Sequence, residues 1–290
     1  MHTARLHEMQ QRQASPSAVA DLALAAALWG GLGVGVLTLF GRLRGESTGW
    51  NLAPHRSTAI AAAVGATSML LQFGGTSLTS GVEGAVVTMS TPVFVLLFGH
   101  AREGESIAPR NWLGIVVATL GVAVLALRAS GALEASSVAN ALNMSRLLGV
   151  GMLIGAGATW ALYSSLGRPI VAAIGARRAI ALTTTFSLPL ILPFAAVEFA
   201  MRGIDLHAAT EPGTLAAIVY LGIGATAIGW SSWYRGYAAA PPRTAAGILF
   251  LQPLVAAVLG VGLLHEPLDA GLAAGALLLL GGVALITRGP

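Results

Sequence analysis

Two stretches of the chain share one pattern and decide its fold: "STPVFVLLFGHAREGESIAPRNWLGIVVATLGVAVLAL", Ser90 to Leu127, and "LQPLVAAVLGVGLLHEPLDAGLAAGALLLLGGVALIT", Leu251 to Thr287. Each copy has a Pro inside an apolar run, a Glu at the end of that run and at least two Gly in the next run. One constant offset of 161, without a gap, matches Pro92 with Pro253, Glu105 with Glu266, Gly114 with Gly275 and Gly121 with Gly282. Such an internal repeat is typical of an architecture built from duplicated units.

The composition places the chain in a membrane. Of its 290 residues, 55% are apolar and 10% are charged, with a mean hydropathy of +0.76, whereas a soluble domain has about 25% charged residues. A membrane-spanning helix needs about 20 mostly apolar residues. We count about nine such segments, roughly 18–40, 57–79, 83–101, 110–128, 147–167, 179–200, 213–238, 243–264 and 269–288. We therefore expect an all-α integral membrane protein.

The repeat predicts how these helices are organised. We expect a polar tail at 1–17, a first repeat of four helices at 18–128, a linker at 129–146 and a second repeat of five helices at 147–290. With the constant offset, the opening helix of the first repeat is missing. A rival alignment of Ala27–Gly31 with Ala158–Leu162 makes the second helix the missing one. Because a five-helix unit has an odd number of spans, tandem units point in opposite directions, which is the inverted repeat of secondary transporters.

Arginine placement predicts the orientation. All 16 basic residues are Arg, and eleven of them fall on one side of the nine-helix arrangement. The positive-inside rule assigns that side to the cytoplasm. We expect a bacterial cytoplasmic membrane, a cytoplasmic C-terminus and an exoplasmic N-terminus. Because the Arg residues follow the spans, their charge reflects membrane topology, and we do not expect nucleic-acid binding.

The doubled pattern resembles the EamA-type carriers of the drug/metabolite transporter superfamily. Each half-repeat of that family has an apolar helix with a central Pro, a Glu at its end, a short turn and a Gly-rich final helix. Both copies occur here, and "GAGATWALYSSLGRP", Gly155 to Pro169, also looks like the family. The resemblance covers about 57–290. It implies a carrier with a central cavity, usually of ten helices in two repeats of five, and it does not identify the substrate.

Pro92 and Pro253 are predicted inside helices. An interior proline removes an amide donor and clashes with the carbonyl four residues earlier. We expect a symmetry-related pair of hinges for alternating access. The alternative is a static kink whose freed carbonyls are satisfied by neighbouring helices.

Glu105 and Glu266 end their apolar runs and are predicted to be structural. A carboxylate at such a position caps a helix or pairs across a turn, and Arg102 and Arg110 are the nearest partners for Glu105. The alternative role is a gate latch.

Polar and aromatic side chains inside the apolar runs are candidates for a substrate cavity. The candidates are Trp160, Tyr163, Trp230, Trp233, Tyr234, Gln72 and Gln252. The stripe from Trp230 to Tyr237 occupies i, i+3, i+4 and i+7 of one helix and so shares a face. Trp230 is deepest, and we expect it to face the cavity, whereas Tyr237 is expected to be an interfacial anchor. Packing for the aromatic residues and interhelical hydrogen bonding for the amides are the alternatives.

Several functions are not expected. The chain has no Cys, no zinc-ligand spacing of His and carboxylates, no phosphate-binding loop and no convergent nucleophile and base, so we expect no metal, no cofactor and no enzyme activity. The leading hypothesis is an exporter of small net-neutral metabolites such as amino acids or aromatic and amphipathic compounds. Its partners are then the substrate and the lipid bilayer, and a monomer and a homodimer both stay open. The alternatives are an organophosphate or nucleotide-sugar exchanger and a non-transporting scaffold or truncated carrier.

Overall fold

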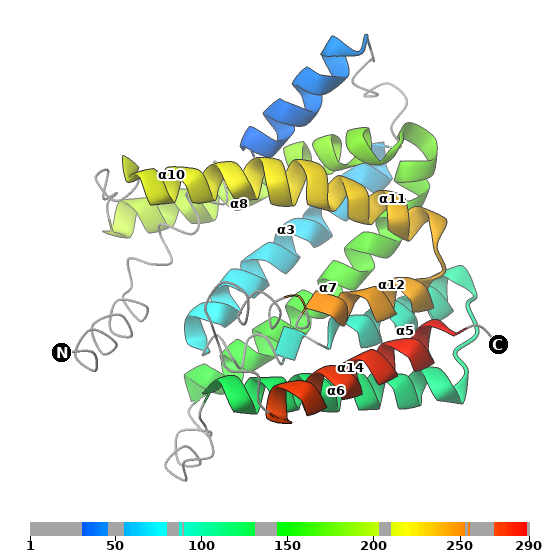
Figure 1. Cartoon of the computed structure of the whole chain (residues 1–290). Coiled ribbons are helices and arrows are strands. Elements are labelled where there is room, and N and C mark those ends of the chain that lie inside the picture. Colours follow the sequence, from blue (N-terminus) through cyan, green and yellow to red (C-terminus); the bar gives the residue numbers. More distant parts are fainter. Residues whose placement is uncertain are drawn as a thin grey trace. The chain divides into compact units, whose positions relative to one another are not determined.

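The computed structural model of the chain is helical (Figure 1). It describes residues 31–45, 55–79, 87–88, 90–130, 144–202, 210–252, 255 and 270–288, and the regular elements in these ranges are all helices. Three helices are long and apolar enough to cross a membrane: His55–Leu78, Leu147–Ile174 and Pro212–Ala239. Shorter apolar helices cover Gly31–Leu43, Pro109–Val124 and Ala273–Thr287. The chain is therefore an all-α membrane protein, as its composition predicts.

The chain divides into two compact units. Unit 1 comprises Met1–Phe73 and Leu166–Arg235, and unit 2 comprises Gly74–Ser165 and Gly236–Pro290. Three helices run from one unit into the other: α3 (His55–Leu78), α7 (Met144–Ile174) and α11 (Ser231–Ala239). Each unit combines segments from both predicted repeats. The compact units are thus a different division from the repeats, whose boundaries stay a prediction.

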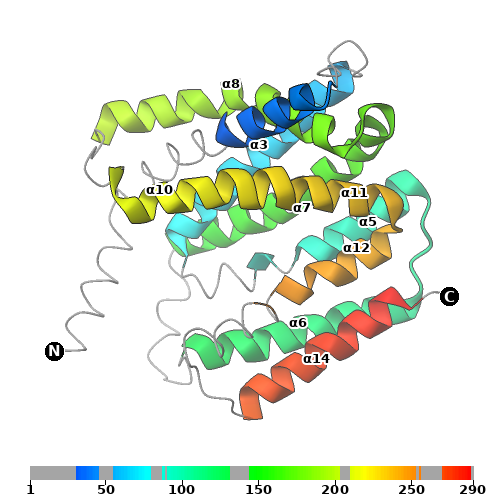
Figure 2. The same ribbon diagram turned by 45° about the horizontal axis from the view of Figure 1, so that its top comes forward.

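Unit 2 is built from α5 (Thr91–Glu103), α6 (Pro109–Ser130), α12 (Pro242–Leu249) and α14 (Ala270–Thr287) with parts of the crossing helices. α6 lies along α14, and α12 packs on both α5 and α14 (Figure 2). The proline-rich start of α12 suits a first helical turn, where a missing N–H costs no intrahelical bond.

The four repeated glycines form the contact between α6 and α14. A Cβ at Gly114 would lie 2.8 Å from the carbonyl oxygen of Gly282, and a Cβ at Gly121 would lie 2.8 Å from that of Gly275. Small residues let membrane helices approach this closely. Because the later glycine of α6 meets the earlier glycine of α14, the two helices are antiparallel. Equivalent helices of the two repeats thus run in opposite directions, as an inverted repeat requires.

Unit 1 contains α8 (Ala176–Arg202), α10 (Pro212–Val219) and a π-helix, η3 (Tyr220–Trp230), which continues into α11. Ser187 on α8 donates a hydrogen bond to the carbonyl of Ala62 on α3, 3.0 Å away. The helix Gly31–Leu43 packs against η3, where a Cβ at Gly33 would lie 3.2 Å from the carbonyl oxygen of Gly222. A long π-helix is rare, and shorter π-bulges are frequent at functional sites.

The prolines are placed differently from the sequence-based expectation. Pro92 is the second residue of α5, in the first turn after the N-cap Ser90, so the expected interior kink at Pro92 is wrong. A proline at this position needs no amide donor and begins the helix without strain. The interior prolines in the described helices are Pro169 in α7 and Pro189 and Pro193 in α8.

Two further predicted residues cannot be placed. Pro253 and Glu266, the second hinge and the second helix-ending carboxylate, lie outside the described residues. Their roles stay predictions.

Candidate functional site

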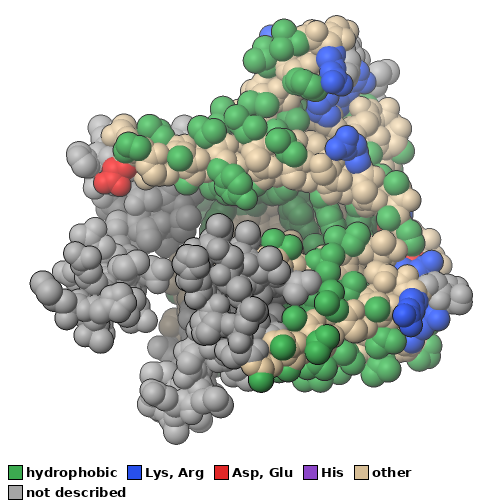
Figure 3. Space-filling view, viewed as in Figure 1, with side chains coloured by type: hydrophobic (Ala, Val, Ile, Leu, Met, Phe, Trp, Pro, Cys, Tyr) green, Lys and Arg blue, Asp and Glu red, His purple; other side chains and the backbone are tan. Residues whose placement is uncertain are grey.

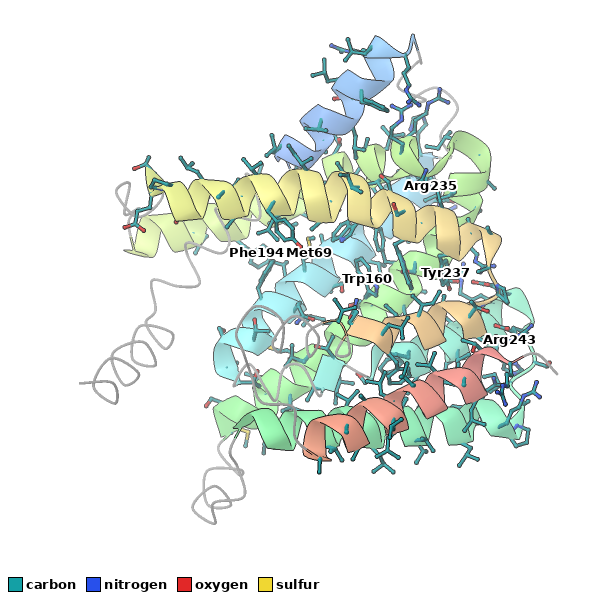
Figure 4. The ribbon with its side chains drawn as sticks, in the orientation of Figure 1. Met69, Trp160, Phe194, Arg235, Tyr237 and Arg243 are labelled. Atoms are coloured by element: carbon teal, nitrogen blue, oxygen red, sulfur yellow. The ribbon has the colours of Figure 1, made fainter. Side chains whose placement is uncertain are left out.

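The C-terminal end of α5 carries a polar cluster inside unit 2. Glu103 accepts two hydrogen bonds at Oε1, from the hydroxyl of Ser165 on α7 at 3.2 Å and from that of Tyr237 on α11 at 3.4 Å. Ser165 is 4% exposed and Tyr237 is 2% exposed. The expected interfacial anchor at Tyr237 is therefore wrong, because its ring is buried and its hydroxyl bonds a carboxylate. Tyr237 and Arg243 lie near the end of α11 and the start of α12 (Figure 4).

Gly104 ends α5 and directs the next residue toward α12. Its φ of 72° is left-handed, a conformation that glycine adopts without a Cβ penalty. The amide of Gly104 bonds the carbonyl of His100, and the amide of Glu105 bonds that of Gly99, both at 3.2 Å. This closing turn satisfies carbonyls that the helix end leaves open. It also fixes the start of the segment that carries Glu105.

Glu105 caps α12 and pairs with its arginine. Nη1 of Arg243 lies 2.9 Å from Oε1, and the backbone amide of Arg243 donates to Oε2 at 3.1 Å. The side chains of Glu105 and Arg243 are 10% and 26% exposed. The expected partners Arg102 and Arg110 are thus replaced by an arginine 138 residues away. A carboxylate suits this position because the first amides of a helix lack partners and the helix dipole is positive there.

Unit 1 has a basic end where the helix Gly31–Leu43 stops (Figure 3). Nη1 of Arg177 donates a hydrogen bond to the carbonyl of Leu37 at 3.1 Å, so α8 holds the last turns of that helix. Burial lowers the pKa of Arg177, and the neighbouring Arg178 and Arg44 lower it further. A guanidinium stays protonated in proteins even so. This end of unit 1 therefore keeps its positive charge.

Two of the predicted cavity aromatics pack on each other in unit 2. The ring centroids of Trp160 and Tyr163 are 5.6 Å apart, with their planes at 50°. Tilted ring pairs at this distance stabilise packing beyond the area that they bury. Tyr163 is 3% exposed, whereas Trp160 is half-buried. Trp160 is thus the ring of this pair with surface left for another contact.

The other three aromatic candidates belong to unit 1. Trp230 ends η3, and Trp233 and Tyr234 follow on α11. Both Trp side chains are half-buried, and Tyr234 is 2% exposed. Tyr234 packs on Gly167 of α7, where a Cβ would lie 2.8 Å from its hydroxyl. Tyr234 therefore occupies a packed position, while the two Trp rings keep accessible surface.

The amide candidates lie in different units. Gln72 is half-buried on α3 in unit 1, and Gln252 is exposed in unit 2. Substrate contact stays a prediction for all seven candidates. No group of three or more His, Asp or Glu that could hold a metal ion is present within the described ranges.

Sequence reasoning missed Glu103. The repeat pattern emphasises Glu105, whereas the position equivalent to Glu103 in the second copy is Leu264. The partners of Glu103 come from α7 and α11, 62 and 134 residues away in the chain. Only the fold brings these residues together, so no local signal could have identified the cluster.

Comparisons with known proteins agree with this architecture. The model of the family described as the EamA-like transporter family matches residues 11–127 and 147–288. Two proteins of Archaeoglobus fulgidus, each described as an uncharacterized transporter, are 26% identical over 216 residues and 27% identical over 224 residues. The first match covers 74% of this chain and 70% of the relative, and the second covers 76% and 72%. A solved crystal structure, 21% identical, superposes with a TM-score of 0.72 over 94% of this chain and 90% of its own, which shows the same fold.

Proposed function

Because the chain belongs to the EamA-like transporter family, we propose that it exports small metabolites without net charge, with amino acids and aromatic or amphipathic compounds as the favoured class. The family and the two archaeal relatives support membrane transport as the general activity. The metabolite class rests on this chain's own residues. A carrier of this kind moves its substrate by alternating access and needs no catalytic group.

The observation that carries the proposal is the chemistry of the membrane-crossing helices. His55–Leu78, Leu147–Ile174 and Pro212–Ala239 each contain one arginine and no carboxylate. Two of them carry the aromatic candidates, including the half-buried Trp160 and Trp230. Aromatic rings accept apolar groups on their faces and also attract cations. A phosphorylated substrate would instead require several cations to bind its charge.

The proline-containing helices provide the bends for alternating access in this proposal. Pro169, Pro189 and Pro193 interrupt α7 and α8, and each removes a hydrogen bond of its helix. Sharp helix kinks arise at identifiable residues, and proline is a common one. The pair of Glu105 and Arg243 then acts as the latch that ties α5 to α12 in one state.

The proposed location is the bacterial cytoplasmic membrane, with the C-terminus in the cytoplasm and the N-terminus outside. Fusions of a reporter that is active only in the exoplasm test this orientation. The N-terminal fusion should be active and the C-terminal fusion inactive. The opposite pattern would reverse the proposed direction of the helices.

A metabolite-resistance screen tests export in cells. Bacteria that produce the chain should tolerate toxic amino-acid analogues at concentrations that inhibit cells with an empty vector. Cells that produce equal amounts of the Trp230→Ala variant should lose this tolerance, since the ring proposed to contact the substrate is absent. Equal sensitivity of all three strains to every amino-acid and aromatic analogue would contradict the proposal.

A further inference from the structure

Unit 1 contains buried hydroxyl groups that lack hydrogen-bond partners. In the described part of the chain, four hydroxyl oxygens are buried in this way, on Ser90, Thr184, Thr226 and Ser231. The last three belong to unit 1, on α8, on η3 and at the first residue of α11. Thr226 is 0% exposed and Ser231 is 9% exposed. Since α8 and η3 are in contact, these hydroxyls belong to neighbouring elements.

These three hydroxyls lack the hydrogen bond to their own helix that other threonines of unit 1 make. Threonines in helices commonly bond the carbonyl four residues earlier. Thr38 does so at 2.8 Å, Thr67 at 2.9 Å and Thr185 at 2.7 Å. Thr226 instead lies in a π-helix, whose hydrogen bonds join residues five apart, so the carbonyls are shifted relative to the side chains. The π-helix therefore leaves a buried hydroxyl available at Thr226.

The same helices carry further hydrogen-bond acceptors. Pro189 has no N–H, so the carbonyl of Thr185, beside Thr184, lacks its helical donor. A carbonyl only accepts, and a hydroxyl oxygen accepts as well. Trp230 follows Thr226 by about one π-helical turn, and the face of an indole ring attracts a cation. Acceptor oxygens beside an aromatic ring suit a ligand group that donates several N–H bonds and carries positive charge.

We propose that unit 1 binds the protonated amine of the substrate between α8 and η3, with the hydroxyl oxygens of Thr184, Thr226 and Ser231 as acceptors. This inference rests on the proposed function and names the group by which the substrate is recognised. Thr226 is buried in this structure, and its methyl carbon packs on the helix Gly31–Leu43, 2.8 Å from the position of a Cβ at Gly33. The amine enters when the helix Gly31–Leu43 moves away from η3.

Binding of labelled L-phenylalanine to the purified full chain tests the proposal. Phenethylamine keeps the ammonium group and lacks the carboxylate, whereas 3-phenylpropionate lacks the ammonium group. Phenethylamine should displace the label, and 3-phenylpropionate should not. The Thr226→Val variant should bind phenethylamine about 10-fold more weakly, the loss expected for one hydrogen bond to a charged group. Ser231→Ala is a second variant with the same expected direction.

A stability measurement distinguishes a loss of substrate recognition from a loss of folded structure in these variants. Removing an unpartnered hydroxyl leaves no unsatisfied group, so the thermal midpoint of Thr226→Val should equal or exceed that of the wild type. The control Thr38→Val loses a hydroxyl that bonds its own helix and should keep wild-type affinity. The amine site would be overturned if both Thr226→Val and Ser231→Ala kept wild-type affinity. It would also be overturned if 3-phenylpropionate displaced the label as strongly as phenethylamine does. Either result would leave the proposed substrate class intact. A wild-type chain that binds none of the three compounds would overturn the proposed substrate class, and the amine site with it.

Discussion

Gly281 and Gly282 are neighbours in α14 with opposite surroundings. A Cβ at Gly282 would lie 2.5 Å from the amide nitrogen of Ala118 and 2.6 Å from the carbonyl oxygen of Gly114. A Cβ at Gly281 would have no atom of the described residues within 4 Å, apart from its chain neighbours and the backbone of its own helix. Replacement of each glycine by alanine therefore adds the same methyl group to the same helix, once into a packed backbone and once into open space.

The two substitutions differ only in packing. Alanine raises helix stability by roughly 0.5–1 kcal/mol over glycine at either position. At Gly282, the nearest atom is a backbone nitrogen at 2.5 Å, so α6 and α14 must separate by about 0.9 Å to reach the ordinary contact distance of 3.4 Å. Such overpacking costs about 1–3 kcal/mol, and the separation also weakens dispersion contacts along the interface. We expect Gly282→Ala to be less stable than Gly281→Ala by about 2 kcal/mol.

Unfolding of the purified variants in mixed micelles, titrated with a denaturing detergent, measures this difference. Gly281→Ala should match or exceed the wild-type free energy of unfolding, and Gly282→Ala should fall below it. Equal stability of the two variants would refute the close antiparallel packing of α6 on α14. Gly121→Ala should also be destabilised, because its Cβ would lie 2.6 Å from the backbone nitrogen of Leu279.

The polar contacts of unit 2 give three further predictions, all measured by the same titration. Glu105→Gln should lower the free energy of unfolding by about 1–3 kcal/mol, because the buried carboxylate pairs with Arg243. This reasoning fails if Glu105→Gln destabilises the chain by the same amount when Arg243 is already replaced by Gln. Asn111→Ala should cost about 1–2 kcal/mol, since the amide bonds the carbonyl of Ile286 at 2.8 Å and also caps α6; a wild-type midpoint would contradict this. Tyr237→Phe should cost about 0.5–1 kcal/mol, because it removes one long hydrogen bond. Tyr237→Ala should cost about 3–5 kcal/mol, because it empties a buried position. Equal losses in the two variants would contradict a packed ring at Tyr237.

Features that depend on composition and on the repeat could be predicted from the sequence. Apolar runs of membrane length lead to a helical membrane protein because the backbone must satisfy its own hydrogen bonds in lipid. The offset that matches Gly114 with Gly275 and Gly121 with Gly282 also anticipates the antiparallel contact of α6 and α14, since equivalent glycines exchange places across it. The resemblance that the repeated residues carry also predicted the family to which the chain belongs.

Features that depend on contacts between residues distant in the sequence could not be predicted from the sequence. Depth along a helix suggested that Tyr237 lies at the membrane surface, but depth does not tell which side of the helix meets other protein. Its partner Glu103 comes from a helix 134 residues earlier. Pro92 was placed inside an apolar run, yet α5 begins one residue before it, because apolar composition continues across a helix start. The π-helix η3 is as apolar as α10, which precedes it, so no sequence pattern marked where the π-helix begins.

Counterflow in proteoliposomes tests most directly whether the chain carries net-neutral metabolites. Vesicles that contain the purified chain and a high internal concentration of L-phenylalanine should take up labelled L-phenylalanine far faster than protein-free vesicles. Vesicles with the Trp230→Ala variant should lose most of this uptake, while Gly281→Ala should keep it. Uptake of labelled organophosphates by loaded vesicles, without counterflow of any amino acid or amphipathic compound, would contradict the account.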